Sequence, residues 1–205
     1  MDIKRICEIA HRHDIVVAVD GTQGAPHMKV DVQDLDCDFY AMSGHKMYGP
    51  SGIGVMYGKG TWIYGLDPAL GGGGMIESVE HGDIEFASGC KKWEAGTLAV
   101  TEIVGLHEAL KFYKNTGLDL MVEHEKQLID HAYNELSKIK GIKFIGNAVR
   151  DAVISFNIQG IHHQDLAMFL DTYGIAVRPG HHCTQMLHKQ MGWSGSVRIS
   201  TGAYN

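Results

Sequence analysis

IVVAVDGTQ, residues 15–23, decides the fold class of this 205-residue chain. Its first five residues are continuously apolar and mostly β-branched, which is typical of a strand buried on both faces of a parallel sheet. Residues 3–13, directly before it, carry apolar side chains at helical spacing. A helix that runs straight into a buried strand predicts an α/β fold, with further strands expected at residues 38–42 and 53–57.

The interior character of the strand at residues 15–19 predicts neighbouring strands on both sides. Few later segments could supply them, so we expect that earlier elements of the sheet are absent from this chain. Residues 66–92 contain four consecutive glycines at 71–74 and are predicted to be irregular. A loop of that length inside a compact domain usually has a function.

The chain is predicted to divide into two domains, residues 1–115 and 116–205, at the break Asn115-Thr116-Gly117. Helical patterns flank this break at residues 99–113 and 118–139. The second domain is predicted to be a small α+β domain. Its expected elements are strands at 152–158, 175–178 and 196–200, a helix at 163–173 and a short helix after Cys183.

The composition excludes several classes of function. Hydrophobic residues make up 44% and charged residues 20% of the chain, with a net charge of −6, so a packed core is expected. No basic run predicts a nucleic-acid or anionic-membrane surface, and the longest apolar stretches are too short to cross a membrane. The four cysteines (Cys7, Cys37, Cys90 and Cys183) form no CxxC pair, which favours reduced thiols and a cytoplasmic protein.

SGHKMYGPSGIG, residues 43–54, contains the strongest local signal for chemistry. Lys46 follows a predicted buried strand and is flanked by a hydroxyl, an imidazole and several glycines. An ordinary surface lysine in a Gly-rich turn is one interpretation. The other is a Schiff-base lysine, which must be partly neutral and is favoured by a crowded, partly desolvated site.

Asp20 ends the first predicted strand, at the edge of the sheet where α/β folds place their ligands. Taken alone, Asp20-Gly21 is typical of an ordinary turn. As a functional group, the carboxylate could pair with a protonated pyridine nitrogen and keep that ring an electron sink. Gln23 could donate a hydrogen bond to the phenolate oxygen of the same ring.

RPGHHC, residues 178–183, allows three interpretations. A zinc site built from its histidines, Cys183 and the nearby His188 is disfavoured, because adjacent side chains point to opposite faces and the spacing matches no common zinc motif. A half-buried structural cysteine is a second interpretation. The third is a nucleophilic Cys183, because imidazoles and Arg178 favour the thiolate. Arg198 lies on a short predicted strand, where an arginine is usually solvated or ion-paired. In an enzyme that acts on amino acids it could instead bind a substrate carboxylate in bidentate geometry.

These segments together resemble the class-V aminotransferase family of fold-type-I pyridoxal-phosphate enzymes. The SGHK run followed by GPxGxG is specific to that class, and RPGHHC resembles the group II cysteine desulfurases, a branch that shades into selenocysteine lyases. The resemblance covers the whole chain in order, through VDGTQ at 19–23, SGHKMYGPSGIG at 43–54, GGGGMI at 71–76, EAGT at 94–97 and RPGHHC at 178–183.

The resemblance implies a fold and a cofactor site. Residues 1–115 would be the C-terminal part of the pyridoxal-phosphate-binding large domain, and residues 116–205 a truncated small domain. The family's phosphate-binding turn and its ring-stacking residue would precede Asp20, so we expect this chain alone to bind the cofactor weakly. The cofactor-binding residues implied for pyridoxal 5'-phosphate are Asp20 for the ring nitrogen, Gln23 for the phenolate oxygen, Ser43 and His45 for the phosphate, Lys46 for the covalent link, and Thr97 for the phosphate of the partner subunit in a homodimer.

The resemblance also implies an activity, that of an L-cysteine desulfurase. Lys46 would act as the base and Cys183 as the nucleophile that takes sulfur as a persulfide and releases alanine. Arg198 would bind the substrate carboxylate, and Arg178 would line the same pocket. A sulfur-acceptor protein and a role in iron–sulfur cluster assembly would follow. The alternatives are a selenocysteine lyase or related lyase, and a non-catalytic fragment that only dimerises.

Overall fold

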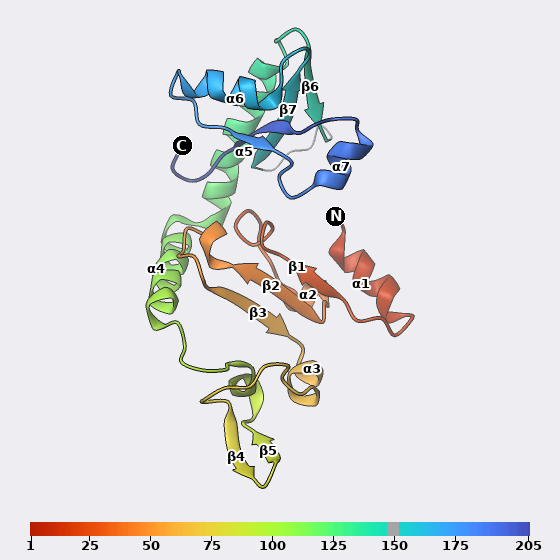
Figure 1. The fold of residues 1–205 in the computed structure, drawn as a ribbon, viewed down its shortest axis with the longest axis vertical. Coiled ribbons are helices and arrows are strands. Elements are labelled where there is room, and N and C mark those ends of the chain that lie inside the picture. The colour runs from red at the N-terminus through yellow and green to blue at the C-terminus, as the bar shows by residue number, and fades with distance from the viewer. Residues whose placement is uncertain (147–151) are drawn as a thin grey trace. The chain divides into compact units, whose positions relative to one another are not determined.

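The computed structural model describes residues 1–146 and 152–205 of the chain, which form two compact units, Met1–Thr116 and Gly117–Asn205 (Figure 1). Both units combine helices with a sheet, so the predicted α/β class is confirmed. Among these residues, none of the helices has the length and apolar character needed to cross a membrane. The two units are described separately below.

The first unit is built around a three-stranded sheet in the order β1-β2-β3, formed by Ala18–Asp20, Phe39–Ser43 and Gly54–Gly58. β1 pairs in parallel with β2, and β2 pairs antiparallel with β3. The core beneath it contains Cys7 of helix α1 (Ile3–His11), Cys37 and Tyr40, all buried. The remaining elements are α2 (Val32–Leu35), η1 (Gly44–Lys46), α3 (Gly60–Gly65), η2 (Gly89–Trp93) and α4 (Val100–Thr116).

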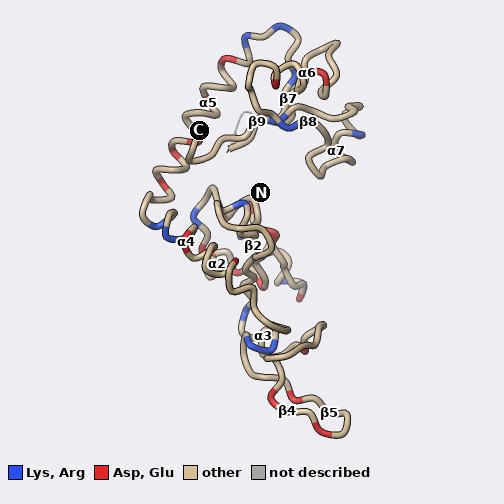
Figure 2. The backbone as a smooth tube through the Cα atoms, turned by 60° about the vertical axis from the view of Figure 1, so that its left-hand side comes forward, with Lys and Arg blue, Asp and Glu red and all other residues tan. Residues whose placement is uncertain are grey.

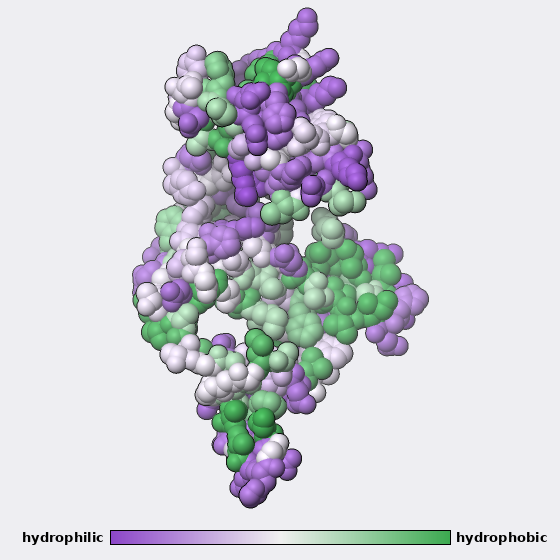
Figure 3. All heavy atoms as spheres, in the orientation of Figure 1, coloured by the Kyte–Doolittle hydropathy of each residue, from purple (hydrophilic) through white to green (hydrophobic). Residues whose placement is uncertain are grey.

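The first strand is shorter and more exposed than predicted. The prediction covered residues 15–19 and both faces, whereas β1 begins at Ala18 and is exposed at both of its ends. Ile15 and Val16 are 56% and 45% exposed. β-Strand geometry requires a ladder partner, and β1 has one in the described sheet, which is β2. Figure 3 shows apolar atoms at the surface of the first unit around α1.

A buried carboxylate ties the elements of the first unit together. Asp38 is 5% exposed and accepts hydrogen bonds from the Val17 backbone N–H at 2.8 Å, from His11 Nε2 at 2.9 Å and from Trp62 Nε1 at 3.1 Å. Val17 and His11 contact Oδ2 and Trp62 contacts Oδ1, from which Lys59 Nζ lies 3.5 Å away. Because these partners come from α1, α3 and the segments before β1 and after β3, this one side chain links four parts of the unit.

Residues 66–92, predicted to be irregular, contain an antiparallel hairpin of β4 (Ile76–Glu80) and β5 (Asp83–Phe86). Glu80 pairs with Asp83, so His81 and Gly82 form a two-residue turn. Both have positive φ, 47° and 103°. A two-residue type I′ turn requires positive φ at both positions, and its twist matches that of the flanking strands. The turn signal was missed because His-Gly is a weaker hairpin signal than Asn-Gly. Figure 2 shows acidic residues along this hairpin.

The second unit contains a four-stranded antiparallel sheet in the order β6-β7-β9-β8. One of its faces packs against helices in a core of Ile129, Ile154, Phe156, Leu166 and Val197, which are all at most 7% exposed. The elements are α5 (Leu118–Leu136), β6 (Ile142–Ile145), β7 (Val153–Ile158), α6 (His163–Asp171), β8 (Arg178–Gly180), α7 (Gln185–Gln190) and β9 (Ser196–Ser200).

Two strand predictions in the second unit are corrected. The strand predicted at 175–178 is observed at Arg178–Gly180, and Ile175 is 50% exposed. Its position is determined by pairing with β9: Arg178 lies opposite Arg198 and Gly180 lies opposite Ser196, the first residue of β9. β6 was not predicted at all, although its sequence Ile-Lys-Phe-Ile alternates. The strand at 196–200 and the short helix after Cys183 are confirmed.

Candidate active site

Parallel pairing brings Asp20 and the Ser43–Lys46 segment to one edge of the first sheet. Asp20 is the last residue of β1 and lies opposite Ala41 of β2. β2 ends at Ser43 and passes directly into η1, whose last residue is Lys46. The carboxyl ends of parallel strands meet at the same edge, which is where α/β sheets bind ligands. We refer to Asp20, Gln23, Ser43, His45 and Lys46 as the Asp20 edge.

The carboxylate of Asp20 is held in its ionised form. Thr22 donates its backbone N–H to Asp20 Oδ1 at 3.0 Å, which closes a short turn of the kind that aspartate favours. Hydrogen bonding by Thr22 is the main cause that lowers the pKa of Asp20, and the positive charge of Lys46 lowers it further. Lys46 is the last residue of η1, which follows β2 at the same edge of the sheet as Asp20.

The remaining side chains of the Asp20 edge rest on a tightly packed backbone. Ser43 Oγ and His45 Nδ1 are hydrogen-bonded at 2.7 Å, and His45 and Lys46 are exposed. Gly44 between them is buried, and a side chain there would meet Ile53 at 2.9 Å. Gln23 is exposed, three residues after Asp20.

Beneath Asp20, the aromatic ring of Tyr40 occupies the place where Gly21 would carry a side chain. A Cβ on Gly21 would lie 1.9 Å from Tyr40 Cζ. The Tyr40 hydroxyl donates to the Gly21 carbonyl at 3.4 Å, and Tyr40 is 4% exposed. The turn after Asp20 therefore needs a glycine so that the backbone can approach the buried ring.

Thr97, the sixth cofactor residue predicted in the first unit, lies elsewhere along the chain. It is exposed in the segment between η2 and α4. Within residues 1–146 and 152–205, no hydrogen bond or ion pair given by the structure joins it to the Asp20 edge. The structure alone therefore assigns Thr97 no place in this edge.

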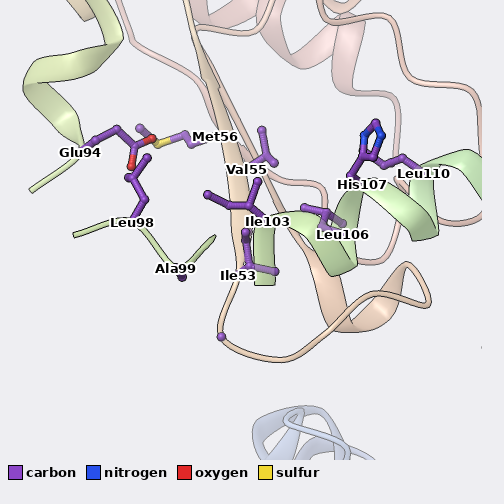
Figure 4. A pocket seen from close by; sticks show the side chains of 12 residues that line it. Ile53, Val55, Met56, Glu94, Leu98, Ala99, Ile103, Leu106, His107 and Leu110 are labelled. Carbon is purple, nitrogen blue, oxygen red and sulfur yellow. The ribbon is translucent and has the colours of Figure 1, made fainter. Parts of the chain in front are cut away.

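A groove of about 570 Å³ lies between β3 and α4 (Figure 4). Val55 and Met56 line one side and Ile103, Leu106 and His107 the other. Its lining includes none of the predicted site residues. We therefore separate this groove from the chemistry and describe two candidate regions, each by itself: the Asp20 edge in the first unit and the sheet of the second unit.

On the second sheet, the strand register places two arginines side by side. Arg178 of β8 lies directly opposite Arg198 of β9, and Arg198 lies opposite Ser155 of β7. Directly opposed residues of an antiparallel pair point to the same face, and like charges in such positions are destabilising. An anion between the two guanidinium groups would remove that repulsion and could accept bidentate hydrogen bonds. We refer to Ser155, Asn157, Arg178, Ser196 and Arg198 as the arginine face.

Cys183 lies in the turn that follows the arginine face. It is three residues after the end of β8, and Nε2 of the neighbouring His182 lies 3.1 Å from the Ser196 carbonyl of β9. Burial lowers the pKa of Arg198, and the charge of Arg178 lowers it further, whereas Cys183 raises it. Cys183 itself is exposed, in the turn between β8 and α7.

Three buried polar atoms in this region have no hydrogen-bond partner among the residues that the structure describes. They are Asn157 Oδ1, His182 Nδ1 and Arg198 Nε. Asn157 uses its amide nitrogen to donate to the Gly195 carbonyl at 2.8 Å. Buried polar atoms are nearly always paired in folded proteins, so a cluster of unpaired ones is expected where a polar ligand binds.

The zinc interpretation of the histidines near Cys183 gains no support. In the described part of the chain, no group of three or more His, Cys, Asp or Glu side chains is arranged to hold a metal ion. His188 is 2% exposed and uses its ring nitrogens for hydrogen bonds to Thr184 and Ser196. His188 is therefore a buried residue that holds neighbouring segments together by hydrogen bonds, a role that the sequence pattern alone did not indicate.

Several residues of the two regions were missed from the sequence. Thr22 could have been found, because Asp-x-Thr is a recognisable turn pattern. Ser196 could also have been found, because it is two residues before Arg198 on a predicted strand and therefore shares its face. Asn157 could not, because only the pairing of β7 with β9 brings it near Arg198. Tyr40 was missed for a similar reason, since its contact with Gly21 spans two strands.

Comparison with known proteins gives consistent results. The aminotransferase class-V family model matches residues 1–205. A probable cysteine desulfurase of Halalkalibacterium halodurans is 44% identical over 203 residues, which are 99% of this chain and 50% of that protein. One of Halobacterium salinarum is 42% identical over 205 residues, covering 99% of this chain and 49% of that protein.

Solved structures show the same correspondence. Escherichia coli cysteine desulfurase CsdA, in its S-sulfonic acid form, superposes with a TM-score of 0.95 at 39% identity, covering 100% of this chain and 51% of that one. The chain spans about half the length of the curated relatives it matches, and the match is to their C-terminal part.

Proposed function

Because this chain belongs to the aminotransferase class-V family, we propose that it provides the lysine and the thiol of a pyridoxal-phosphate-dependent cysteine desulfurase. The observation that carries the proposal is the register of β8 and β9, which sets Arg178 opposite Arg198, with Cys183 in the turn three residues after β8. That arrangement suits a small carboxylate whose other end presents sulfur to a thiol. L-cysteine has both groups.

The Asp20 edge fits pyridoxal 5'-phosphate. Asp20 is ionised and near Lys46, as a partner of a protonated ring nitrogen must be. Ser43 and His45 offer a hydroxyl and an imidazole to a phosphate, and Gln23 offers an amide to the phenolate oxygen. When bound, the cofactor supplies an electron sink that makes the Cα proton of an amino acid acidic.

Within this site, Lys46 is proposed to bind the cofactor covalently and to move a proton. Its neutral Nζ accepts the proton from the Cα atom of L-cysteine and returns a proton to carbon later in the cycle. Asp20 stays negative throughout, because hydrogen bonding by Thr22 favours its charged form. The first unit is accordingly proposed to be part of the large, cofactor-binding domain, and the second unit to be the small domain.

Cys183 is proposed to be the sulfur acceptor. Its thiolate Sγ attacks the sulfur of L-cysteine, an S–S bond forms, and the Cβ–S bond breaks. The electron pair of that bond remains with Cβ, which takes up a proton. L-cysteine and the Cys183 thiol thus become L-alanine and the Cys183 persulfide, with one C–S and one S–H bond exchanged for one S–S and one C–H bond.

Further features of the proposed function come from the family resemblance. A homodimer, in which Thr97 contacts the phosphate of the partner subunit, would agree with the exposure of Thr97. A sulfur-acceptor protein must then remove the persulfide, and iron–sulfur cluster assembly is a pathway that consumes such sulfur. A cytoplasmic location stays a prediction from the cysteine pattern.

The direct test is a Cys183→Ala variant of the cofactor-loaded protein, with Cys90→Ala as the matched control because Cys90 is also exposed. Mass spectrometry after incubation with L-cysteine should find a persulfide on Cys183, and alanine formation should be lost in Cys183→Ala alone. Alanine formation at the unaltered rate without Cys183 would contradict the proposal. Absence of cofactor binding by the unsubstituted protein would instead favour a non-catalytic fragment.

A further inference from the structure

The turn that presents Cys183 has an unusual backbone. His182 and Cys183 have φ values of 51° and 63°, so two consecutive residues that are not glycine lie in the left-handed region. Side chains disfavour this conformation, and it persists only where the surroundings determine it. Local bonds account for part of this, since Thr184 donates both its N–H, at 2.8 Å, and its hydroxyl, at 2.7 Å, to the His181 carbonyl.

One long-range bond to the turn comes from His182 itself. Its Nε2 lies 3.1 Å from the Ser196 carbonyl, which can only accept, so Nε2 carries the proton. The other nitrogen, Nδ1, is then an unprotonated acceptor. Burial, Arg198, His188 and Arg178 lower the pKa of His182, which favours this neutral form, while the bond to Ser196 opposes the shift.

A second long-range bond comes from His188, one turn into α7. Its Nδ1 lies 3.0 Å from the Thr184 carbonyl and therefore donates, which leaves Nε2 to accept from the Ser196 hydroxyl at 3.0 Å. His188 is 2% exposed and Ser196 is 0% exposed, so water does not compete for these bonds. Ser196 is thus held through its carbonyl by one histidine and through its hydroxyl by the other.

Ser196 is also two residues before Arg198 on β9, on the same face of the strand. We propose that His182, His188 and Ser196 form a clamp that holds the Cys183 turn in register with the two arginines, so that the thiol meets a carboxylate bound between Arg178 and Arg198. The three are positioning residues, and the proposal rests on the role of Cys183 proposed above. They affect the reaction by determining where the Cys183 thiol lies, and they do not contact the substrate.

The test compares two alkylating reagents of nearly equal size on the full chain. Iodoacetate carries a carboxylate, whereas iodoacetamide is neutral. Mass spectrometry gives the rate constant for each cysteine, and the iodoacetate-to-iodoacetamide ratio at Cys183 is divided by the same ratio at Cys90, which lies in the other unit. This normalised ratio reports whether a carboxylate is guided to the thiol and is insensitive to reagent concentration.

Ser196→Ala removes only the hydroxyl and should lower the normalised ratio about five- to tenfold, the effect of losing one or two oriented hydrogen bonds. His182→Ala should lower it similarly. His182→Gln should restore it to within about twofold, because a glutamine amide can place a donor near the position of Nε2. Ser200→Ala, on the same strand but exposed, should leave the ratio unchanged.

The outcomes separate the clamp from the proposed function. If Arg198→Ala lowers the normalised ratio but Ser196→Ala and His182→Ala do not, the carboxylate site stands and the clamp is wrong. If neither Arg198→Ala nor Ser196→Ala has an effect, both the carboxylate site and the clamp are wrong. Circular dichroism of each variant checks that the fold is retained, and a loss of ratio in His182→Gln equal to that in His182→Ala would also overturn the clamp.

Discussion

At the Asp20 edge, the side chains proposed to do chemistry are exposed and only the backbone beneath them is tightly packed, as at Gly21 and Gly44. On the arginine face the opposite holds. Arg198 is half-buried, Ser196 is fully buried, and Arg178 opposes a like charge. In the first region, exposed side chains stand on a tightly packed backbone. In the second, the fold itself holds two like charges opposite each other.

This difference has a consequence for mutations. Changing an exposed side chain of the Asp20 edge should alter cofactor chemistry and leave the free energy of unfolding unchanged. Changing an arginine of the second region should alter substrate binding and, by removing like-charge repulsion, raise stability. Substitutions that stabilise a protein but impair its function are common at binding sites in which unfavourable groups are held close together.

Lys46→Ala should have the largest effect. Borohydride reduction in the presence of pyridoxal phosphate should label the peptide that contains Lys46, and the label should be lost completely in the variant. Because Lys46 is exposed, the unfolding free energy should change by less than about 0.5 kcal/mol. Lys91→Ala, at another exposed lysine, is the control, and label on the peptide containing Lys91 would contradict the assignment.

Arg198→Ala should raise the Michaelis constant for L-cysteine about ten- to a hundredfold, since a charge-assisted contact contributes roughly 1.5–3 kcal/mol. The same change should leave stability unaltered or raise it by up to about 1 kcal/mol, because Arg178 loses a like-charged neighbour. Steady-state kinetics of the cofactor-loaded protein and urea unfolding measure the two effects. An unchanged Michaelis constant would move the carboxylate contact to Arg178.

Asp38→Asn should destabilise the first unit by about 2–3 kcal/mol, because it removes the charge from a buried group with several donors. Burial alone would raise the pKa of Asp38, but hydrogen bonds from Val17, His11 and Trp62 and the charge of Lys59 outweigh it and hold the pKa well below its usual range.

A lowered pKa gives Asp38 a stabilising contribution that is complete above the unfolded value of about 3.9 and is lost as the pH falls below it. Urea unfolding at pH 7 and between pH 5 and pH 3 should therefore show a smaller acid-induced loss of stability in Asp38→Asn than in the unsubstituted chain. Asp14→Asn is the matched control, because Asp14 is exposed and asparagine also tolerates its φ of 56°. Parallel pH profiles for Asp38→Asn and the unsubstituted chain would refute this account.

Gly21→Ala should destabilise the first unit by about 1–2 kcal/mol, less than Asp38→Asn, because the new methyl group displaces the Tyr40 ring. The displacement should also disturb the turn that holds Asp20 and weaken cofactor binding. Gly71→Ala has no heavy atom within 4 Å of the new carbon and should be neutral. Thermal unfolding followed by circular dichroism compares the two, and equal melting temperatures would show that Tyr40 adapts freely.

Local sequence patterns were sufficient where a residue's surroundings are close to it in the chain. The helix before the first strand, the strand at 196–200 and the long helices on either side of Gly117 were all predicted, because their periodicity and end signals are local. The hairpin at Ile76–Phe86 and the position of β8 were not, because strand limits depend on partners that are distant in sequence.

By itself, the sequence determined the α/β class and the order of the family's motifs, and these pointed to a lysine, an aspartate and a cysteine as candidate groups. Only the tertiary structure decided which groups become neighbours. Parallel pairing of β1 with β2 brings Asp20 near Lys46, and antiparallel pairing of β8 with β9 sets Arg178 against Arg198. Ser196 acquires its two histidine partners in the same way, because hydrogen bonds between segments depend on register, which no local pattern encodes.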